Sequence, residues 1–242
     1  LGGGSPIDAA KAIAALATNP GKVAAFMGLN KIAAPAAPII AIPTTAGTGS
    51  EVTRFTIITD TAKDVKMLIV SDYLMPQAAI VDPMLTLSMP GWVAASTAID
   101  ALTHAIESYV SRKAQPLTET LSLEAIRLIG ACLRRAWGNP EDLEAKHNVM
   151  LGSMVAGMAF SNSSVAMVHG MSRPIGANFH VPHGLSNAIL LPLVMEFSCV
   201  AAPEKYADVA DAMGVDTEGL SPMEAAMEGV AEVQALCEDI RI

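Results

Sequence analysis

The histidines are the side chains of this sequence that point most directly to chemistry. There are five of them: His104, His147, His169, His180 and His183. Asp100 precedes His104 by four residues, so on a helix the two side chains share one face. Their neighbours are apolar, and an isolated carboxylate buried among apolar residues is costly. A cation bound by both side chains would remove that cost, and so would a plain hydrogen bond between them, which the pair taken alone favours.

Two further histidines shift the balance toward a metal. His169 follows an apolar run and precedes a glycine, and His183 lies in a Pro-His-Gly turn ahead of another apolar segment. Histidines beside apolar helices and glycine turns are unusual choices for a plain surface. One carboxylate and three imidazoles form a ligand set that suits Fe²⁺ or Zn²⁺. The predicted metal ligands are therefore Asp100, His104, His169 and His183.

The remaining histidines and the cysteines carry less weight. His147 lies among charged residues, and we expect it to face solvent. His180 is close to His183 and could line the same pocket, although a packed histidine without a chemical role fits equally well. The cysteines are odd in number, widely spaced and without a CxxC motif, which favours buried reduced thiols in a cytoplasmic protein: Cys132, Cys199 and Cys237.

Two polar turns in the first half of the sequence could bind a phosphate. Gly2-Gly3-Gly4-Ser5 directly precedes a predicted helix, and the free N–H groups at a helix start attract anions. Alone, this turn fits a phosphate site and a simple connection equally well, and it is not the GxGxxG fingerprint. The second turn, residues 43–50, follows a predicted buried strand, where ligands of open α/β sheets bind, although an ordinary Ser/Thr-rich loop is the alternative. The pair of turns together favours nucleotide binding.

The elements that must position these residues change in kind near Pro90. Before it, the pattern predicts a helix at residues 7–19 and strands at 39–42, 55–59, 67–70 and 78–81, with a turn at 60–64. After it, the pattern predicts helices at 92–110, 117–137, 140–160, 183–197, 203–213 and 222–240. The predicted fold is therefore an α/β segment at 1–90, part of a nucleotide-binding parallel sheet, followed by an all-α metal-binding segment at 91–242.

Composition limits the class of protein. The 242 residues are 52% hydrophobic and 16% charged, which fits a globular chain with a sizeable core. The net charge of −9 argues against nucleic acid or an anionic membrane as partner, and uninterrupted apolar stretches fall short of the roughly 18 residues that span a bilayer. The α/β segment holds too few strands for a doubly wound sheet, and Leu1 is not an initiator methionine. We therefore expect residues that precede Leu1 to be absent from this chain.

Four motifs, in order along the chain, resemble those of the iron-type (group III) alcohol dehydrogenases. Residues 2–11, GGGSPIDAAK, resemble the phosphate turn of that family, and residues 43–52, PTTAGTGSEV, resemble its second cofactor loop. Residues 100–107, DALTHAIE, resemble the first metal pair. The sequences HGM at 169–171 and PHG at 182–184 resemble the third and fourth ligands. The resemblance covers essentially the whole chain.

The resemblance implies a two-domain enzyme of dehydroquinate synthase-like architecture, with NAD or NADP in the cleft between the sheet and the helices. It also implies a homo-oligomer, a dimer or larger. Carried over position by position, it implies the cofactor-binding residues Gly3, Gly4, Ser5, Asp8, Thr44, Thr45, Thr48 and Lys66. Gly3, Gly4 and Ser5 would bind the pyrophosphate, the threonines would line the nucleotide, and Lys66 would reach the nicotinamide ribose.

One position departs from the family pattern. Arg173 lies four residues after His169, where many relatives place another histidine. An arginine there could hold a substrate carboxylate or a cofactor phosphate, or it could form a structural ion pair. Family members also extend beyond both ends of this chain.

The activity that the resemblance implies is the NAD(P)-dependent oxidation of small alcohols, or reduction of aldehydes, with Fe²⁺ or Zn²⁺ polarising the oxygen. Two alternatives within the enzyme class are a hydroxyacid–oxoacid transhydrogenase and a polyol dehydrogenase. An alternative outside it is a truncated, non-catalytic relative that binds metal or oligomerises.

Overall fold

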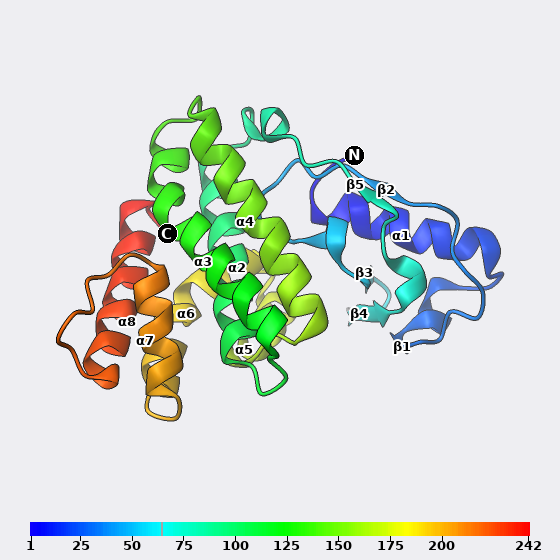
Figure 1. Ribbon diagram of the computed structural model, residues 1–242. Coiled ribbons are helices and arrows are strands. Elements are labelled where there is room, and N and C mark those ends of the chain that lie inside the picture. Colours follow the sequence, from blue (N-terminus) through cyan, green and yellow to red (C-terminus); the bar gives the residue numbers. More distant parts are fainter. Residues whose placement is uncertain (64) are drawn as a thin grey trace.

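The computed structural model describes residues 1–63 and 65–242, and it places an α/β segment beside a helical one (Figure 1). Asp64, in the predicted turn at 60–64, lies outside the described residues. The α/β segment holds one long helix and five short strands: α1 (Gly4–Thr18), β1 (Gly28–Leu29), β2 (Ile40–Ala41), β3 (Phe55–Asp60), β4 (Val65–Val70) and β5 (Ala78–Ala79). Short 3₁₀ turns at Val23–Phe26, Ser50–Val52, Asp72–Leu74 and Pro83–Thr86 connect them.

The strands form two small sheets. β3 and β4 pair antiparallel over six residues each, which confirms the predicted strand pair at 55–59 and 67–70. β1 pairs in parallel with the other edge of β4, and β2 pairs in parallel with β5. The larger sheet is therefore mixed and not wholly parallel, because a short turn can join only antiparallel neighbours. The strands predicted at 39–42 and 78–81 are reduced to two residues each.

Helix α1 is fixed against the β3–β4 hairpin by polar contacts as well as apolar ones. Lys11 of α1 is fully buried against the hairpin, and its ammonium donates hydrogen bonds to the carbonyl oxygens of Thr53 (2.7 Å) and Phe55 (2.8 Å). At the other end, the Asn19 side chain accepts bonds from the backbone N–H groups of Ala33 and Ala34. These bonds satisfy the buried polar groups around α1, so the helix is held at a fixed place beside the sheet.

Seven helices make up the rest of the described chain: α2 (Gly91–Val110), α3 (Pro116–Gly138), α4 (Leu143–Asn162), α5 (Met167–Phe179), α6 (His183–Cys199), α7 (Pro203–Ala212) and α8 (Pro222–Asp239). Helix α2 lies at the centre and packs against α3, α4 and α6, and most of its residues are buried. Figure 1 shows α7 and α8 at the end of the bundle away from the sheets.

Six of the seven helices agree with the predicted ranges within a few residues. Helix α5 was not predicted, because Gly170, Pro174 and Gly176 all weaken a helical pattern. It forms nonetheless, because it is anchored at its first turn on α2, as described below. The three cysteines are buried and unpaired, as predicted, and His147 is exposed, as predicted.

Two glycines let the loop at residues 43–50 pack closely on the helical segment. A Cβ added at Gly47 would lie 2.4 Å from the carbonyl oxygen of Thr97 in α2. Gly49 has a φ of 59°, and an added Cβ would lie 2.7 Å from the Cα of Gly157 in α4. Only glycine fits such close backbone approaches. The predicted cofactor loop is thus seated directly on the helix that carries Asp100.

Over the ranges 1–63 and 65–242, no helix taken singly is long and apolar enough to cross a bilayer. Helices α4 and α5 meet the length and composition criteria only as a pair, and the chain bends by 100° between them.

Candidate metal centre

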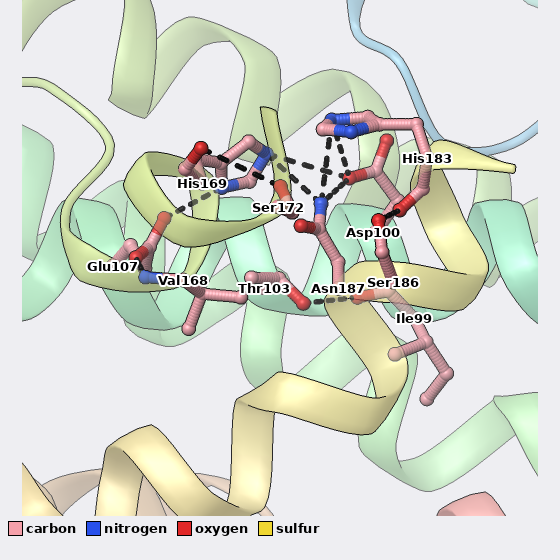
Figure 2. Close-up of polar contacts among 10 residues, drawn as sticks. All are labelled: Ile99, Asp100, Thr103, Glu107, Val168, His169, Ser172, His183, Ser186 and Asn187. Atoms are coloured by element: carbon pink, nitrogen blue, oxygen red, sulfur yellow. Dashed lines mark hydrogen bonds and ion pairs between the residues drawn. The ribbon is translucent and has the colours of Figure 1, made fainter. Parts of the chain in front are cut away.

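Three of the four predicted metal ligands meet where α5 and α6 begin, against the middle of α2 (Figure 2). Asp100 lies in α2, His169 in the first turn of α5, and His183 is the first residue of α6. One ligand atom from each lies within 4.8 Å of the other two. Asp100 and His169 are buried, whereas the His183 side chain is 40% exposed. The cluster therefore has a closed side within the bundle and an open side at His183.

A glycine contact sets the distance between α6 and α2. A Cβ added at Gly184 would lie 2.2 Å from the carbonyl oxygen of Ser96, which is far too close for any larger residue. Ser96 lies one helical turn before Asp100. The Gly184 contact therefore places His183, its neighbour, beside the Asp100 carboxylate, with Nε2 of His183 3.7 Å from Oδ1 of Asp100.

Glu107 anchors α5 and orients its histidine. One carboxylate oxygen accepts a hydrogen bond from the backbone N–H of Val168 (2.5 Å), and the other lies 2.6 Å from Nδ1 of His169. Nδ1 donates to this carboxylate, so Nε2 is left to face Asp100 at 3.4 Å. Such a carboxylate–histidine pair decides which ring nitrogen faces a metal. Our sequence prediction missed Glu107, although its position seven residues after Asp100, on the same helix face, was a usable signal.

Asn187 lies among the three ligand atoms, and it too was missed. Its Nδ2 donates to Oδ1 of Asp100 at 2.6 Å and lies 3.2 Å from Nε2 of His169 and 3.3 Å from Nε2 of His183. Its Oδ1 is buried and has no hydrogen-bond partner among the described residues. Asn187 follows His183 by four residues, so both lie on one face of α6.

His104 lies beside this cluster but is not one of the three converging ligands. Its ring stacks between Phe160 (4.2 Å between centroids) and His169 (4.5 Å). Its Nδ1 is buried without a hydrogen-bond partner among the described residues. A buried ring nitrogen left unpaired next to three converging ligand atoms fits a cation site, since it would otherwise be costly. The role of His104 as fourth ligand stays a prediction.

The electrostatics of the cluster favour a cation. Burial raises the pKa of Asp100, but the neighbouring imidazoles outweigh this and hold it well below its usual range. Burial lowers the pKa of His104 to about 4 and also lowers that of His183. Burial lowers the pKa of His169 too, but its bonds to Asp100 and Glu107 raise it to about 9. At neutral pH the Asp100 carboxylate is charged and His104 and His183 are neutral, which are the forms that bind metal, whereas His169 would release a proton when a metal binds.

The two predicted phosphate turns lie against each other. A Cβ added at Gly3 would lie 3.2 Å from the Thr45 side chain, and one at Gly4 would lie 2.8 Å from that of Thr48. Helix α1 begins at Gly4, and its N-cap, Gly3, makes no side-chain cap bond, so the first N–H groups have no capping side chain. This arrangement suits an anion at a helix start.

Asp8, another predicted cofactor residue, is engaged within the protein. Its carboxylate accepts bonds from the Ser50 hydroxyl (2.7 Å) and the backbone N–H of Ile57 (3.0 Å). Burial raises the pKa of Asp8 despite these bonds. The geometry assigns it a part in holding the loop, α1 and β3 together; direct contact with a cofactor stays a prediction.

A cavity of about 300 Å³ opens between the β3–β4 hairpin and the helices that carry the histidines. Its wall includes Lys66, His180 and His183 of the candidate metal centre, together with Thr59, Gly176, Ala177, Val181 and Pro182. Lys66 and His180, which the sequence placed near the cofactor and the pocket, are thus brought together beside His183. Arg173 is exposed, one turn before this wall on α5.

Comparison with known proteins identifies the family. Residues 94–242 match the family model described as "Fe-containing alcohol dehydrogenase family, C-terminal", and residues 1–83 match "Iron-containing alcohol dehydrogenase". The chain belongs to the iron-containing alcohol dehydrogenases. The resemblance and the fold expected from the sequence motifs are therefore confirmed.

Curated and solved members of the iron-containing alcohol dehydrogenases show the same likeness. The chain is 43% identical over 242 residues to 1,3-propanediol dehydrogenase of Citrobacter freundii and 45% identical over 244 residues to lactaldehyde reductase of Escherichia coli K12. A solved 1,3-propanediol oxidoreductase superposes with a TM-score of 0.96 at 42% identity, over 99% of this chain and 63% of that one. Sulfoacetaldehyde reductase from Bifidobacterium kashiwanohense, solved in complex with NAD⁺, superposes with a TM-score of 0.89 at 32% identity, over 99% of this chain and 62% of that one. The whole chain spans 62% and 63% of the lengths of the two curated relatives.

Proposed function

We propose that this chain is an NAD(P)-dependent, metal-dependent alcohol dehydrogenase or aldehyde reductase acting on small alcohols. The observation that carries this proposal is the convergence of Asp100, His169 and His183, from three different helices, within 4.8 Å. The names of two relatives, 1,3-propanediol dehydrogenase and lactaldehyde reductase, support a small substrate.

In this proposal the metal is Fe²⁺ or Zn²⁺, held by Asp100, His104, His169 and His183. When bound, it supplies Lewis-acid polarisation of the substrate oxygen. The chain's own residues keep the ligands in place: Glu107 orients the ring of His169, and Asn187 donates to Asp100. The half-exposed His183 faces the cavity, where a small substrate would approach the cluster.

The cofactor in this proposal is NAD or NADP, with its pyrophosphate at the start of α1 on Gly3, Gly4 and Ser5. Thr44, Thr45 and Thr48 would line the nucleotide, and Lys66 the nicotinamide end. The contact of the two turns supports this, and so does the NAD⁺ complex of the sulfoacetaldehyde reductase. The division into a cofactor domain at 1–90 and a metal domain at 91–242, a cytoplasmic location and assembly into a homo-oligomer belong to the same proposal.

A single substitution tests the metal site. His183→Ala should lose metal binding, measured as metal per chain after loading with Fe²⁺ or Zn²⁺ and desalting, and should lose NAD(P)H-dependent reduction of short aldehydes. His147→Ala is the matched control, because His147 is exposed and far from the cluster in sequence, and it should behave like the unmodified chain. Full metal occupancy and activity in His183→Ala would overturn the assignment.

One observation favours a second candidate, a non-catalytic binding or oligomerising module. Helix α6 exposes a row of large apolar side chains along one face: Ile189, Leu193, Phe197 and Val200. Exposed apolar patches of this kind mark surfaces that other chains cover. A well-folded, metal-loaded chain that turns over no aldehyde with NADH or NADPH would favour this candidate.

Within the enzyme class, a cofactor that stays bound through many turnovers would indicate a hydroxyacid–oxoacid transhydrogenase instead of a simple dehydrogenase or polyol dehydrogenase.

A further inference from the structure

The cavity beside His183 is basic in an otherwise acidic chain. The sequence carries a net charge of −9, yet none of the described residues that line the cavity is a carboxylate. Lys66 and His180 contribute nitrogen groups to its wall. At about 300 Å³ it falls at the lower end of small-molecule pockets. A small anion would therefore enter it without meeting negative charge on the wall.

The Lys66 ammonium is accommodated in the wall by a glycine. Lys66 lies on β4, opposite Thr59 of β3, and its side chain reaches across to α5. A Cβ added at Gly176 would lie 3.3 Å from Nζ of Lys66. The absence of a side chain at this position leaves room for the ammonium between the hairpin and α5, so this charge is placed at the wall next to His183.

Arg173 extends the basic surface along α5. It lies three and four residues before Gly176 and Ala177, which both line the cavity, so the three share one face of the helix. Arg173 takes part in none of the ion pairs formed among residues 1–63 and 65–242.

The backbone also turns sharply at this wall. His180 caps α5 in the left-handed conformation, with a φ of 55°. Non-glycine residues adopt this conformation rarely and at a cost, and such residues cluster at functional sites. The turn brings His180 and His183 to the same cavity, one at each end of the short connection between α5 and α6.

We propose that the cavity binds the carboxylate of a short hydroxy acid or oxo acid. Arg173 is its cationic partner, Lys66 at the nicotinamide end adds positive charge to the same wall, and the hydroxyl or carbonyl end of the same molecule faces His183. An arginine can bind a carboxylate through two parallel N–H bonds, which a neutral alcohol group cannot match. This inference rests on the proposed function, since it names the substrate class of the same site.

The test compares two ligands that differ in one group. The metal-loaded chain is titrated calorimetrically with 3-hydroxypropionate and with 1,3-propanediol, in which a neutral hydroxymethyl group replaces the carboxylate. We expect the acid to bind roughly tenfold more tightly, as one charge-assisted hydrogen bond would provide. Arg173→Gln should remove this advantage and leave the diol unchanged, and Arg173→Lys should restore part of it. Arg127→Gln, an exposed arginine on α3, is the charge-matched control and should change neither affinity.

Each other outcome counts against the inference. It is overturned if acid and diol bind equally to the unmodified chain, or if Arg173→Gln weakens both equally. It is also overturned if that variant weakens NAD⁺ and not the acid, because the arginine then serves the cofactor. If Arg173→Gln fails to fold, the salt dependence of binding to the unmodified chain is the test: added KCl must weaken binding of the acid far more than binding of the diol. Failure of the proposed function looks different, since the unmodified chain would then take up no metal or turn over no alcohol of either kind.

Discussion

Glu107 decides which nitrogen of His169 can meet a metal. Its carboxylate accepts from Nδ1 of His169, so Nε2 is the ring nitrogen that faces Asp100. The same carboxylate receives the backbone N–H of Val168, at the start of α5. One buried side chain thus fixes both the orientation of the His169 ring and the position of the helix that carries it.

Replacing Glu107 by glutamine should weaken metal binding by roughly 10- to 100-fold. The amide can still accept from Val168, but its NH₂ group facing His169 would favour the tautomer that carries the proton on Nε2, where the metal should bind. The measurement is a competition titration with a metal-sensitive chelator. Glu124→Gln is the matched control, since Glu124 forms only an exposed ion pair with Arg127. An unchanged affinity in Glu107→Gln would show that Glu107 does not orient the ligand.

Among the elements, α2 is the platform of the site. It carries Asp100, His104 and Glu107 on neighbouring turns, and it contacts the loop at residues 43–50 through Gly47 and α6 through Gly184. Both glycines touch backbone atoms of α2, which cannot move aside as a flexible side chain could. One backbone contact therefore sets the position of the loop on α2, and the other sets the distance between α6 and α2.

Gly184→Ala should lower the free energy of unfolding by about 1–3 kcal/mol, because its methyl group would overlap the Ser96 carbonyl oxygen. It should also weaken metal binding, since His183 moves with α6. Gly170→Ala is the matched control: an added Cβ there meets nothing within 4 Å, and alanine in a helix should raise stability by about 0.5–1 kcal/mol. Urea unfolding of both variants measures the effect, and equal shifts of the same sign would refute this account.

At the scale of the whole molecule, the buried Lys11 makes stability depend on pH. Burial lowers its pKa to about 8, against 10.5 for the free side chain, even though Asp8 and Glu51 raise it. Between these two values the unfolded chain binds more protons than the folded one. The free energy of unfolding must therefore rise with pH across this window.

Lys11→Met tests this coupling. Relative to the variant, the unmodified chain should gain about 2–3 kcal/mol of stability between about pH 7 and about pH 10, because only it loses a buried charge over that range. The variant also lacks the bonds to Thr53 and Phe55, a loss that depends little on pH, so the slope of the difference is the readout. Urea unfolding at several pH values provides it. A stability difference that stays flat, or falls as pH rises, would contradict the burial of a charged Lys11.

The sequence by itself determined the family, the order of an α/β part before a helical part, and the ligand types, because these depend on local patterns. Asp100 and His104 share a helix face at any tertiary arrangement, and a glycine-rich turn before a helix exposes N–H groups wherever it lies. Helix α5 was missed because its glycines and proline oppose helix locally, whereas the bond from Val168 to Glu107, 61 residues away, stabilises it.

Only the tertiary structure decided which side chains meet. Asn187 and Glu107 join the metal cluster, Asp8 is used inside the protein, and Lys66 comes from another segment to the cavity beside His183. Each of these contacts joins residues from different elements. They depend on packing such as the close backbone contact at Gly184 and the room that Gly176 leaves for the Lys66 side chain. Sequence spacing records periodicity within one element but not the distance between two. The sequence could therefore propose the side chains of the candidate metal centre, three of which converge, but it could not propose most of their partners.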